Sequence, residues 1–178
     1  MKKTMSIIVF FAVLLLLGSA ATNNAIDGVK GFQAPIFKVE RNDSVVSLDD
    51  MRGHWVLLQF WSSSDAPSRI AGKQYTAIEQ KLNDGQSAER FHLLSVNMDR
   101  SERLFREIVR RDGLSAETQF HIEGNRANQL INDYHLESGM QSFLIDPSGR
   151  IVAKNPTEQT LTQLTCDYVK SSPKPVLQ

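Results

Sequence analysis

Few residues of this chain have the types and spacing that catalysis or metal binding requires. The 178 residues include a single cysteine, Cys166, so the chain cannot form an internal disulfide. The four histidines are scattered and match no zinc-ligand spacing, and we predict neither a metal site nor a cofactor. Ser62, Ser63 and Ser64 follow an apolar run, but no glycine-flanked nucleophile elbow surrounds them. A serine hydrolase is therefore disfavoured.

The composition is that of one globular domain without a charge bias. Lysine and arginine number 20 and aspartate and glutamate also 20, so the formal net charge is zero. A protein that binds nucleic acid would carry an excess of positive charge, and we predict no nucleic-acid partner. The hydrophobic content of 41% is sufficient for a packed core and argues against disorder.

The first 21 residues are typical of a bacterial secretory signal peptide. Lys2 and Lys3 precede the uncharged apolar run 7–17, and small residues follow at 18–21. The run is shorter than the roughly 20 apolar residues that span a bilayer, and no cysteine follows it that could carry a lipid anchor. We therefore expect a periplasmic or otherwise extracytoplasmic protein, with residues 22–30 as a flexible lead-in. Membrane attachment is expected only if the segment stays uncleaved.

Alternating strands and helices are predicted over the rest of the chain. Nearly continuous apolar runs at 55–61, 91–96 and 143–145 are typical of strands covered on both faces. The turn sequence 146–149 leads into a further strand at 151–153, so this pair reads as a hairpin. Apolar residues at helical spacing predict three helices, at 67–82, 101–111 and 125–134.

A last helix is predicted to start at Asn155, with Pro156 in the first helical position and Glu158 completing a capping box. Residues 171–178 contain two prolines and read as a flexible tail. Strands separated by helices imply an α/β domain over 31–170, with a central mixed sheet and helices on both faces. Gly113 is expected to end the helix over 101–111.

Several segments, in this order, resemble the TlpA/ResA-type thioredoxin-like family. They are Gly31–Phe37, Ser47–His54, Leu57–Ser63 and Tyr134–Ile151, and the resemblance extends to Leu164. It implies a thioredoxin-like fold for the mature chain. It also implies an active site at the start of the helix that follows the strand 55–61.

This active site is where the chain departs from the family. The resemblance places the family's Cys-x-x-Cys at Asp65-Ala66-Pro67-Ser68, its cis-proline at Met140, and a frequent aromatic residue at Ser64. Disulfide exchange needs a thiolate to attack and a second thiol to resolve the mixed disulfide. A carboxylate and a hydroxyl supply neither, so the family's redox activity is not expected at these positions.

Two interpretations of Asp65 remain open. Asp65 can cap the helix by accepting a hydrogen bond from the backbone N–H of Ser68, or its charge can help to bind a basic or amide-bearing partner. Met140 is expected to have a trans peptide bond, because a cis bond without proline costs about 2.5–4 kcal/mol. Its default role is packing in the core or at its rim.

The leading hypothesis is a redox-inactive binding or interaction module for an extracytoplasmic protein or peptide. Its groove is expected around the family's active-site positions, Trp61, Ser64, Asp65, Pro67, Ser68 and Met140. A second hypothesis is a relative of thiol–disulfide oxidoreductases that works through Cys166 or with a partner's cysteines; Cys166 can equally be an inert thiol or a link between two chains. A third is a structural subunit of an envelope assembly.

Overall fold

The structure is a computed structural model that describes residues 31–41, 44–84 and 91–171, except for the side chains at 41, 44 and 166–171. The predicted leader, lead-in and all but the first residue of the predicted tail lie outside this part. The elements in chain order are β1 (Lys38–Arg41), β2 (Ser44–Ser47), the 3-10 helix η1 (Leu48–Met51), β3 (Trp55–Trp61), α2 (Ala66–Asn83), β4 (Phe91–Asn97), α3 (Glu102–Asp112), β5 (Gln119–His121), α4 (Gly124–Asp133), β6 (Ser142–Ile145), β7 (Ile151–Lys154) and α5 (Glu158–Ser171).

A five-stranded mixed sheet forms the centre of the domain, as predicted, with the strand order β5-β4-β3-β6-β7. β3, β4 and β5 are parallel, whereas β6 and β7 run antiparallel to them. All seven side chains of β3 are buried, which explains the continuous apolar run in this segment.

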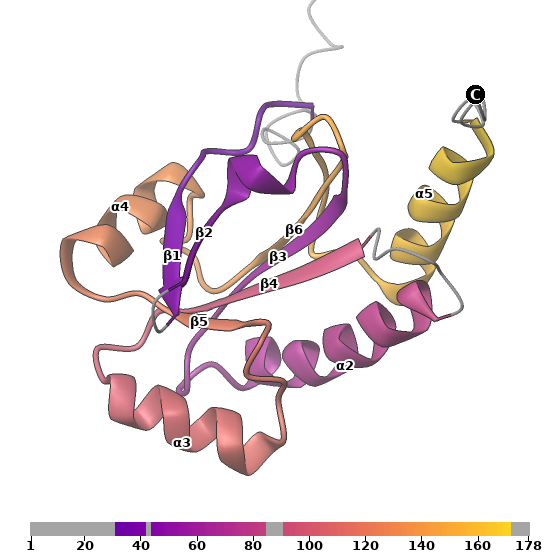
Figure 1. The fold of residues 1–178 in the computed structure, drawn as a ribbon. Coiled ribbons are helices and arrows are strands. Elements are labelled where there is room, and N and C mark those ends of the chain that lie inside the picture. Colours follow the sequence, from indigo (N-terminus) through magenta and orange to yellow (C-terminus); the bar gives the residue numbers. More distant parts are fainter. Residues whose placement is uncertain (1–30, 42–43, 85–90, 172–178) are drawn as a thin grey trace, which may run out of the picture.

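Helices cover both faces of the sheet. Successive side chains of a strand point to opposite faces, and all seven of β3 are buried, so each face needs a cover. Leu58 and Phe60 pack in the cluster that α4 and the N-terminal segment complete, while Leu57 packs in the cluster of α2 and α5. Trp61 packs against α3 on the same face as Leu57. Figure 1 shows α2 and α3 on one side of the sheet and α4 with the β1–β2 hairpin on the other.

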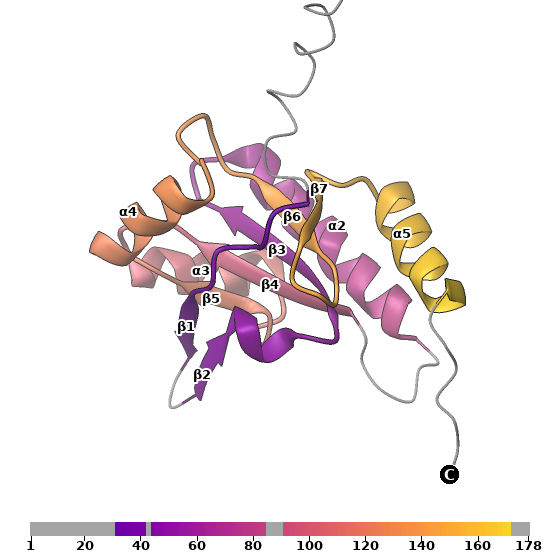
Figure 2. The ribbon, with the colours of Figure 1, turned by 90° about the horizontal axis from the view of Figure 1, so that it is seen from above.

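Several short elements, most of them near the N-terminus of the described part, were not predicted from the sequence. The β1–β2 hairpin, η1 and the three-residue strand β5 are all too short to give a clear apolar period. The chain at Gly31 is tied to β7, because its N–H donates to the Ile151 carbonyl at 2.7 Å and Ile151 N–H donates to Phe32 at 2.9 Å. From there the chain crosses over the sheet to reach β1 (Figure 2).

The predicted helix ends are right for α3 and wrong for α5. Gly113 ends α3 in the left-handed conformation, with φ of 66°. α5 starts at Glu158, later than predicted, and Thr157 caps it by accepting the Thr160 N–H at 3.2 Å. Asn155 instead turns the chain between β7 and α5, with φ of 46°, and its side chain accepts the Ser142 N–H at 2.8 Å. The Asn155 side chain, which was expected to cap α5, therefore binds the backbone of β6 instead.

Within the part of the chain that the structure describes, no helix is long and apolar enough to cross a membrane. The apolar run 7–17 lies outside that part. Cys166 lies on α5, but its side chain is outside the described residues.

Candidate functional site

The segments that carry the predicted site meet at the end of the sheet where β3 and β4 finish. Met98 N–H donates to the Trp61 carbonyl at 2.9 Å, and Phe60 N–H donates to the Gln141 carbonyl at 2.9 Å. The loop after β3, the loop after β4 and the segment before β6 are thereby joined. Ligands of open α/β sheets bind at this end, beyond the carboxyl ends of the parallel strands.

Asp65 caps α2 in the manner expected from the sequence. Its Oδ1 accepts the Ser68 backbone N–H at 2.8 Å, and its own backbone is extended. The Ser68 hydroxyl donates back to the Asp65 carbonyl at 3.0 Å, and Pro67 occupies the first turn, where a missing N–H costs nothing. Asp65 and Ser68, where the resemblance places the family's two cysteines, therefore carry oxygen groups that hold the helix start together.

The cap can be separated from the charge by substitution. Asp65→Ala should lower the free energy of unfolding by about 1 kcal/mol, because Ser68 N–H loses its acceptor. Asp65→Asn should change it by only a few tenths of that, because asparagine caps equally well. Urea unfolding of the two variants measures both values. Equal losses in both variants would contradict the capping role.

The other predicted positions differ in accessibility. Ser64 and Pro67 are exposed and Asp65 is half-buried, so these three can contact a partner. Ser68 is buried beneath the first turn of α2. The Ser64 hydroxyl pairs with the Ser62 hydroxyl at 3.0 Å.

Trp61 lies beneath the site and does not line it. Its side chain is only 2% exposed and packs against Phe105 of α3, with ring centroids 6.0 Å apart. The indole Nε1 has no hydrogen-bond partner among the described residues. Trp61 was expected at the groove surface; at the end of β3 it faces α3, which covers it, and a partner at the surface would not touch it.

Met140 is half-buried and packs against the core cluster that contains Phe60. No cis peptide bond occurs among the described residues, in agreement with the trans bond expected at Met140. The next residue, Gln141, pairs with β3 through its carbonyl. Its side-chain Oε1 is buried and has no partner in the part of the chain that the structure describes. Packing at the rim of the core is the role that the structure gives to Met140.

Asp99 organises the loop after β3 and was missed in the sequence. Ser63 N–H donates to both of its carboxylate oxygens, at 3.1 and 3.0 Å. The Asn97 amide donates to Asp99 Oδ2 at 2.9 Å, and His121 Nε2–H donates to the Asp99 carbonyl at 2.8 Å. Polar residues directly after the strand 91–97 were the signal available, because ligand and loop contacts concentrate at strand ends.

Gln59 holds α2 to the sheet and was hidden in an apolar run. Its amide donates to the Ser68 carbonyl at 2.6 Å, and its Oε1 accepts the Ser95 hydroxyl at 3.0 Å. The helix comes close at Gly72, where a Cβ would lie 3.2 Å from Gln59 Oε1. Because both polar ends of the buried amide are bonded, they fix the first turns of α2.

An ion pair joins the beginning of α2 to the end of α3. Arg69 donates to Asp112 Oδ2 from Nη2 at 2.6 Å and from Nε at 3.2 Å. Burial by itself would raise the pKa of Asp112. The hydrogen bond and charge of Arg69, with Lys73 and Arg111 nearby, outweigh burial and hold that pKa below its ordinary value.

Asp112→Asn should lower the free energy of unfolding by about 1–2 kcal/mol at pH 7, because a largely buried, doubly bonded carboxylate is lost. A lowered folded-state pKa stabilises the protein above the unfolded-state value, near 3.9, and this benefit fades as the pH falls through the folded-state value. The difference from wild type should therefore shrink at pH 3. Urea unfolding at both pH values measures it, with the exposed Glu117→Gln as control. A difference that does not depend on pH would contradict the ion-pair explanation.

Among the residues that the structure describes, no group of three or more histidine, cysteine, aspartate or glutamate side chains could hold a metal ion. His54 and His92 lie close together, with ring centroids 5.0 Å apart, but they belong to the other end of β3 and β4.

A mixed sheet of this order with helices on both faces, and a helix that starts at the end of the strand β3, define a thioredoxin-like protein. The family model described as AhpC/TSA matches residues 31–154, and the chain belongs to this family. The homologues of this chain are thiol–disulfide oxidoreductases of the ResA/TlpA type. The ResA protein of Bacillus cereus is 25% identical over 144 residues, which cover 80% of this chain and 79% of the relative.

Solved structures agree with this assignment. A thioredoxin-like protein from Parabacteroides distasonis is 32% identical, with a TM-score of 0.60, and the match covers 76% of this chain and 93% of that chain. The thioredoxin domain of a thiol-disulfide oxidoreductase from Bacteroides vulgatus shares the fold with a TM-score of 0.67, at 23% identity over 79% of this chain and 97% of that one.

Proposed function

We propose that this chain is an exported thioredoxin-like binding module that holds an extracytoplasmic protein or peptide without exchanging disulfides. One observation supports the proposal: Asp65 and Ser68, at the positions where the resemblance places the family's two cysteines, bond to each other at 2.8 and 3.0 Å. Exchange requires one sulfur to attack and a second to resolve. The oxygen groups at these positions cannot form or release a disulfide.

The surface at the head of α2 favours a contact role. Ser64 and Pro67 are exposed, and Ile70 in the next turn is 61% exposed. Asp65, which is half-buried, lies between Ser64 and Pro67 in the sequence, so the first turns of α2 present both an apolar side chain and an acceptor. A partner with an apolar side chain and a basic or amide group has the matching chemistry.

A photoreactive amino acid at position 64 tests the contact. We expect a crosslinked adduct in vivo from position 64, and none from the exposed position 163 on α5, which serves as the control. With the crosslinker at 64, Asp65→Asn should reduce the adduct, because it keeps the cap and removes the charge. Equal adducts from both positions would reject a specific surface at the head of α2.

The second candidate is thiol–disulfide exchange through Cys166, and the names of the relatives favour it. In such a step the Cys166 thiolate would attack a partner's disulfide, form a mixed disulfide and release one partner thiolate. A partner thiol would then have to resolve it, because the chain has no second cysteine. Insulin reduction by dithiothreitol in the presence of the purified protein separates the candidates. Catalysis that Cys166→Ser abolishes would replace the binding module with the exchange reaction.

An extracytoplasmic location is part of the proposal. The sequence 1–21 supports it, and one solved neighbour is described as a secreted thiol-disulfide isomerase of Corynebacterium glutamicum. Fractionation of cells that express the full chain tests it. Recovery with the cytoplasmic fraction, at the unprocessed mass, would reject export.

A further inference from the structure

Three cations from two helices converge on one carboxylate at the junction of α2 and α3, which lie on the same side of the sheet (Figure 1). Asp112 is the last residue of α3, and its side chain is only 8% exposed. Arg69 Nη2 lies 2.6 Å from one of its oxygens, while Arg111 Nε and Lys73 Nζ lie 3.6 and 3.9 Å from the other. This cationic cluster of Arg69, Lys73 and Arg111 therefore carries two positive charges more than Asp112 neutralises.

Lys73 and Arg111 keep donors that the described part of the protein does not use. Arg69 donates two hydrogen bonds to Asp112, but the separations of Lys73 and Arg111 from the carboxylate are too long for hydrogen bonds. Both side chains are more than half exposed, at 55% and 56%. Since their nitrogens lie beside the same oxygen, Asp112 Oδ1, one carboxylate arriving from solvent can reach both without breaking the bonds of Arg69.

The end of α3 explains only part of this cluster. Positive charge in the last turn of a helix is favoured by the helix dipole, which accounts for Arg110 and Arg111. Lys73 lies near the middle of α2, where the dipole of its own helix gives no such benefit. The chain as a whole has a formal net charge of zero, so the excess at the junction is local.

An apolar side chain lies next to the cluster on the exposed face of α2. Ile70 is 61% exposed, and Lys73 follows it at i+3, where side chains of a helix are neighbours. Ala66 and Ala77 are exposed on the same strip of the helix, so no bulky residue of this strip covers Ile70. The exposed face of α2 therefore joins an apolar contact to a positively charged one.

The carboxylates on α3 limit what can bind here. Glu102 pairs with Arg106 at 2.6 Å, and Glu107 pairs with Arg110 at 2.7 Å. An extended anionic surface, such as a membrane, would have to approach these two glutamates as well as the cluster. A single acidic side chain that reaches the junction of α2 and α3 would not.

We propose that the cationic cluster binds an acidic side chain of the partner segment that contacts the head of α2. The segment places an apolar side chain on Ile70 and, one or two residues further on, a carboxylate that accepts hydrogen bonds from Lys73 and Arg111, while an amide of the same segment faces Asp65. The inference rests on the proposed contact at the head of α2 and adds the chemistry of the partner, an apolar residue followed by aspartate or glutamate. Charge complementarity of this kind contributes specificity and speeds association.

The test is an NMR titration of the ¹⁵N-labelled protein at low salt with the capped peptide acetyl-Gly-Leu-Glu-Glu-Gly-amide. The uncharged control peptide is acetyl-Gly-Leu-Gln-Gln-Gly-amide. We expect the acidic peptide to give saturable shifts of the Ile70, Lys73 and Arg111 amides, and the control peptide to bind at least about fivefold more weakly. Binding of the acidic peptide should weaken at about 0.5 M salt, because exposed charges are screened.

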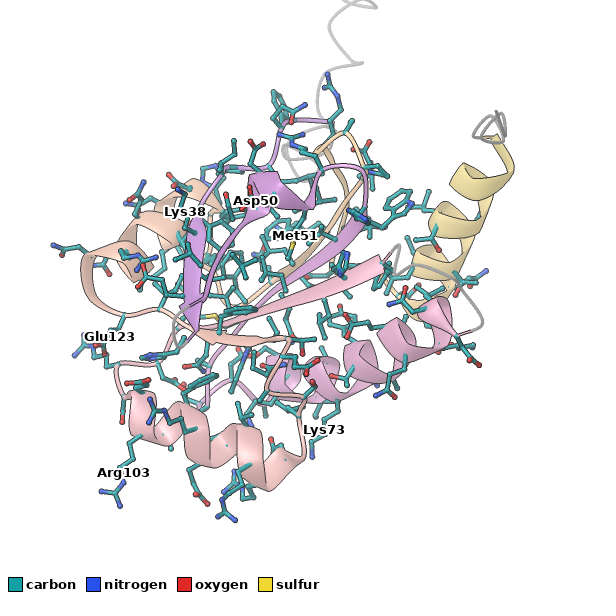
Figure 3. All side chains as sticks on the ribbon, viewed as in Figure 1. Lys38, Asp50, Met51, Lys73, Arg103 and Glu123 are labelled. Carbon is teal, nitrogen blue, oxygen red and sulfur yellow. The ribbon has the colours of Figure 1, made fainter. Side chains whose placement is uncertain are left out.

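Lys73→Gln and Arg111→Gln should each weaken binding of the acidic peptide about two- to fivefold, the effect of one exposed ion pair. Arg103→Gln is the matched control, because it removes the same charge from α3. Arg103 lies near the start of α3 and points away from the body of the protein, whereas Lys73 lies near the other end of that helix (Figure 3). All three side chains are exposed, and a dispersed spectrum checks that each variant is folded.

Absence of shifts at millimolar acidic peptide would overturn the proposal, and so would equal binding of the two peptides. An equal loss of affinity in Arg103→Gln would also overturn it, since that would indicate a general attraction between charges. Binding to phosphatidylglycerol vesicles that the double variant Lys73→Gln, Arg111→Gln abolishes would replace the acidic partner with a membrane. The crosslink from position 64 is scored separately: an adduct that persists unchanged in this double variant would overturn the acidic contact and leave the contact at the head of α2 intact.

Discussion

The double substitution Asp65→Cys and Ser68→Cys should turn this chain into a catalyst of disulfide reduction. The backbone at the head of α2 already places the two positions in the first helical turn, with Ala66 and Pro67 between them. A thiol at position 65 would lie at the positive end of the helix, where its pKa falls and thiolate accumulates. The buried position 68 would hold the resolving thiol.

We expect insulin reduction by dithiothreitol to accelerate at least about tenfold over the parent, because the parent has no pair of thiols to cycle. The measurement is the turbidity of precipitating insulin, supported by a count of free thiols before and after oxidation. Each single substitution is a control and should accelerate the reaction much less than the pair, because a lone thiol depends on dithiothreitol to resolve its mixed disulfide.

If the double variant reduced insulin no faster than the parent, the two thiols alone would not be sufficient for activity at this site. Met140→Pro, added to the double variant, then asks whether the segment before β6 must also change. Met140 packs against the core, and the carbonyl of the following Gln141 holds β3. A gain only in the triple variant would locate the remaining defect in that segment.

The parts of the fold that the sequence could predict are those with a strong local pattern. β3 is buried along its whole length, so its sequence is apolar without interruption. α3 ends at Gly113 because the left-handed conformation there favours glycine. Asp65 caps α2 through a contact within four residues, which depends on the local chain alone.

The parts that could not be predicted depend on register and on contacts between distant segments. Asp99 binds Ser63 across 36 positions of sequence, and no local spacing encodes that pair. In the sequence Gln59 only interrupts an apolar strand, and its role depends on α2, whose Ser68 carbonyl accepts its amide N–H. Asn155 was assigned to capping α5 because its neighbours fit a cap, whereas its side chain pairs with β6. In each case a tertiary partner overrode or extended the local signal.

These observations connect the loss of sulfur with the retention of the site. Asp65 and Gln59 bind the backbone of Ser68 at the head of α2. Asp99 binds the backbone of Ser63 in the loop before the helix. None of the three bonds needs a cysteine. The head of α2 is therefore held in place without any sulfur, as the proposed contact surface requires.

Phe60→Ala should cause the largest loss of stability of any substitution proposed for this chain, about 3–5 kcal/mol. The ring is completely buried and touches Tyr134, Phe143 and Phe37, with centroid separations of 4.9, 6.3 and 6.3 Å. Alanine would lose this burial and leave a cavity between the sheet and α4. Domains of this size are stable by only about 5–15 kcal/mol, so a large part of the total would disappear.

The matched control is Phe32→Ala, because Phe32 is 65% exposed and its removal should change stability by no more than about 0.5 kcal/mol. Urea unfolding of the two variants, followed by circular dichroism, gives both values under one protocol. Similar losses in the two would mean that the aromatic cluster is not the centre of the core. A large loss at Phe60 alone would show that β3, the strand that leads into the site, is anchored in the packed core of the domain.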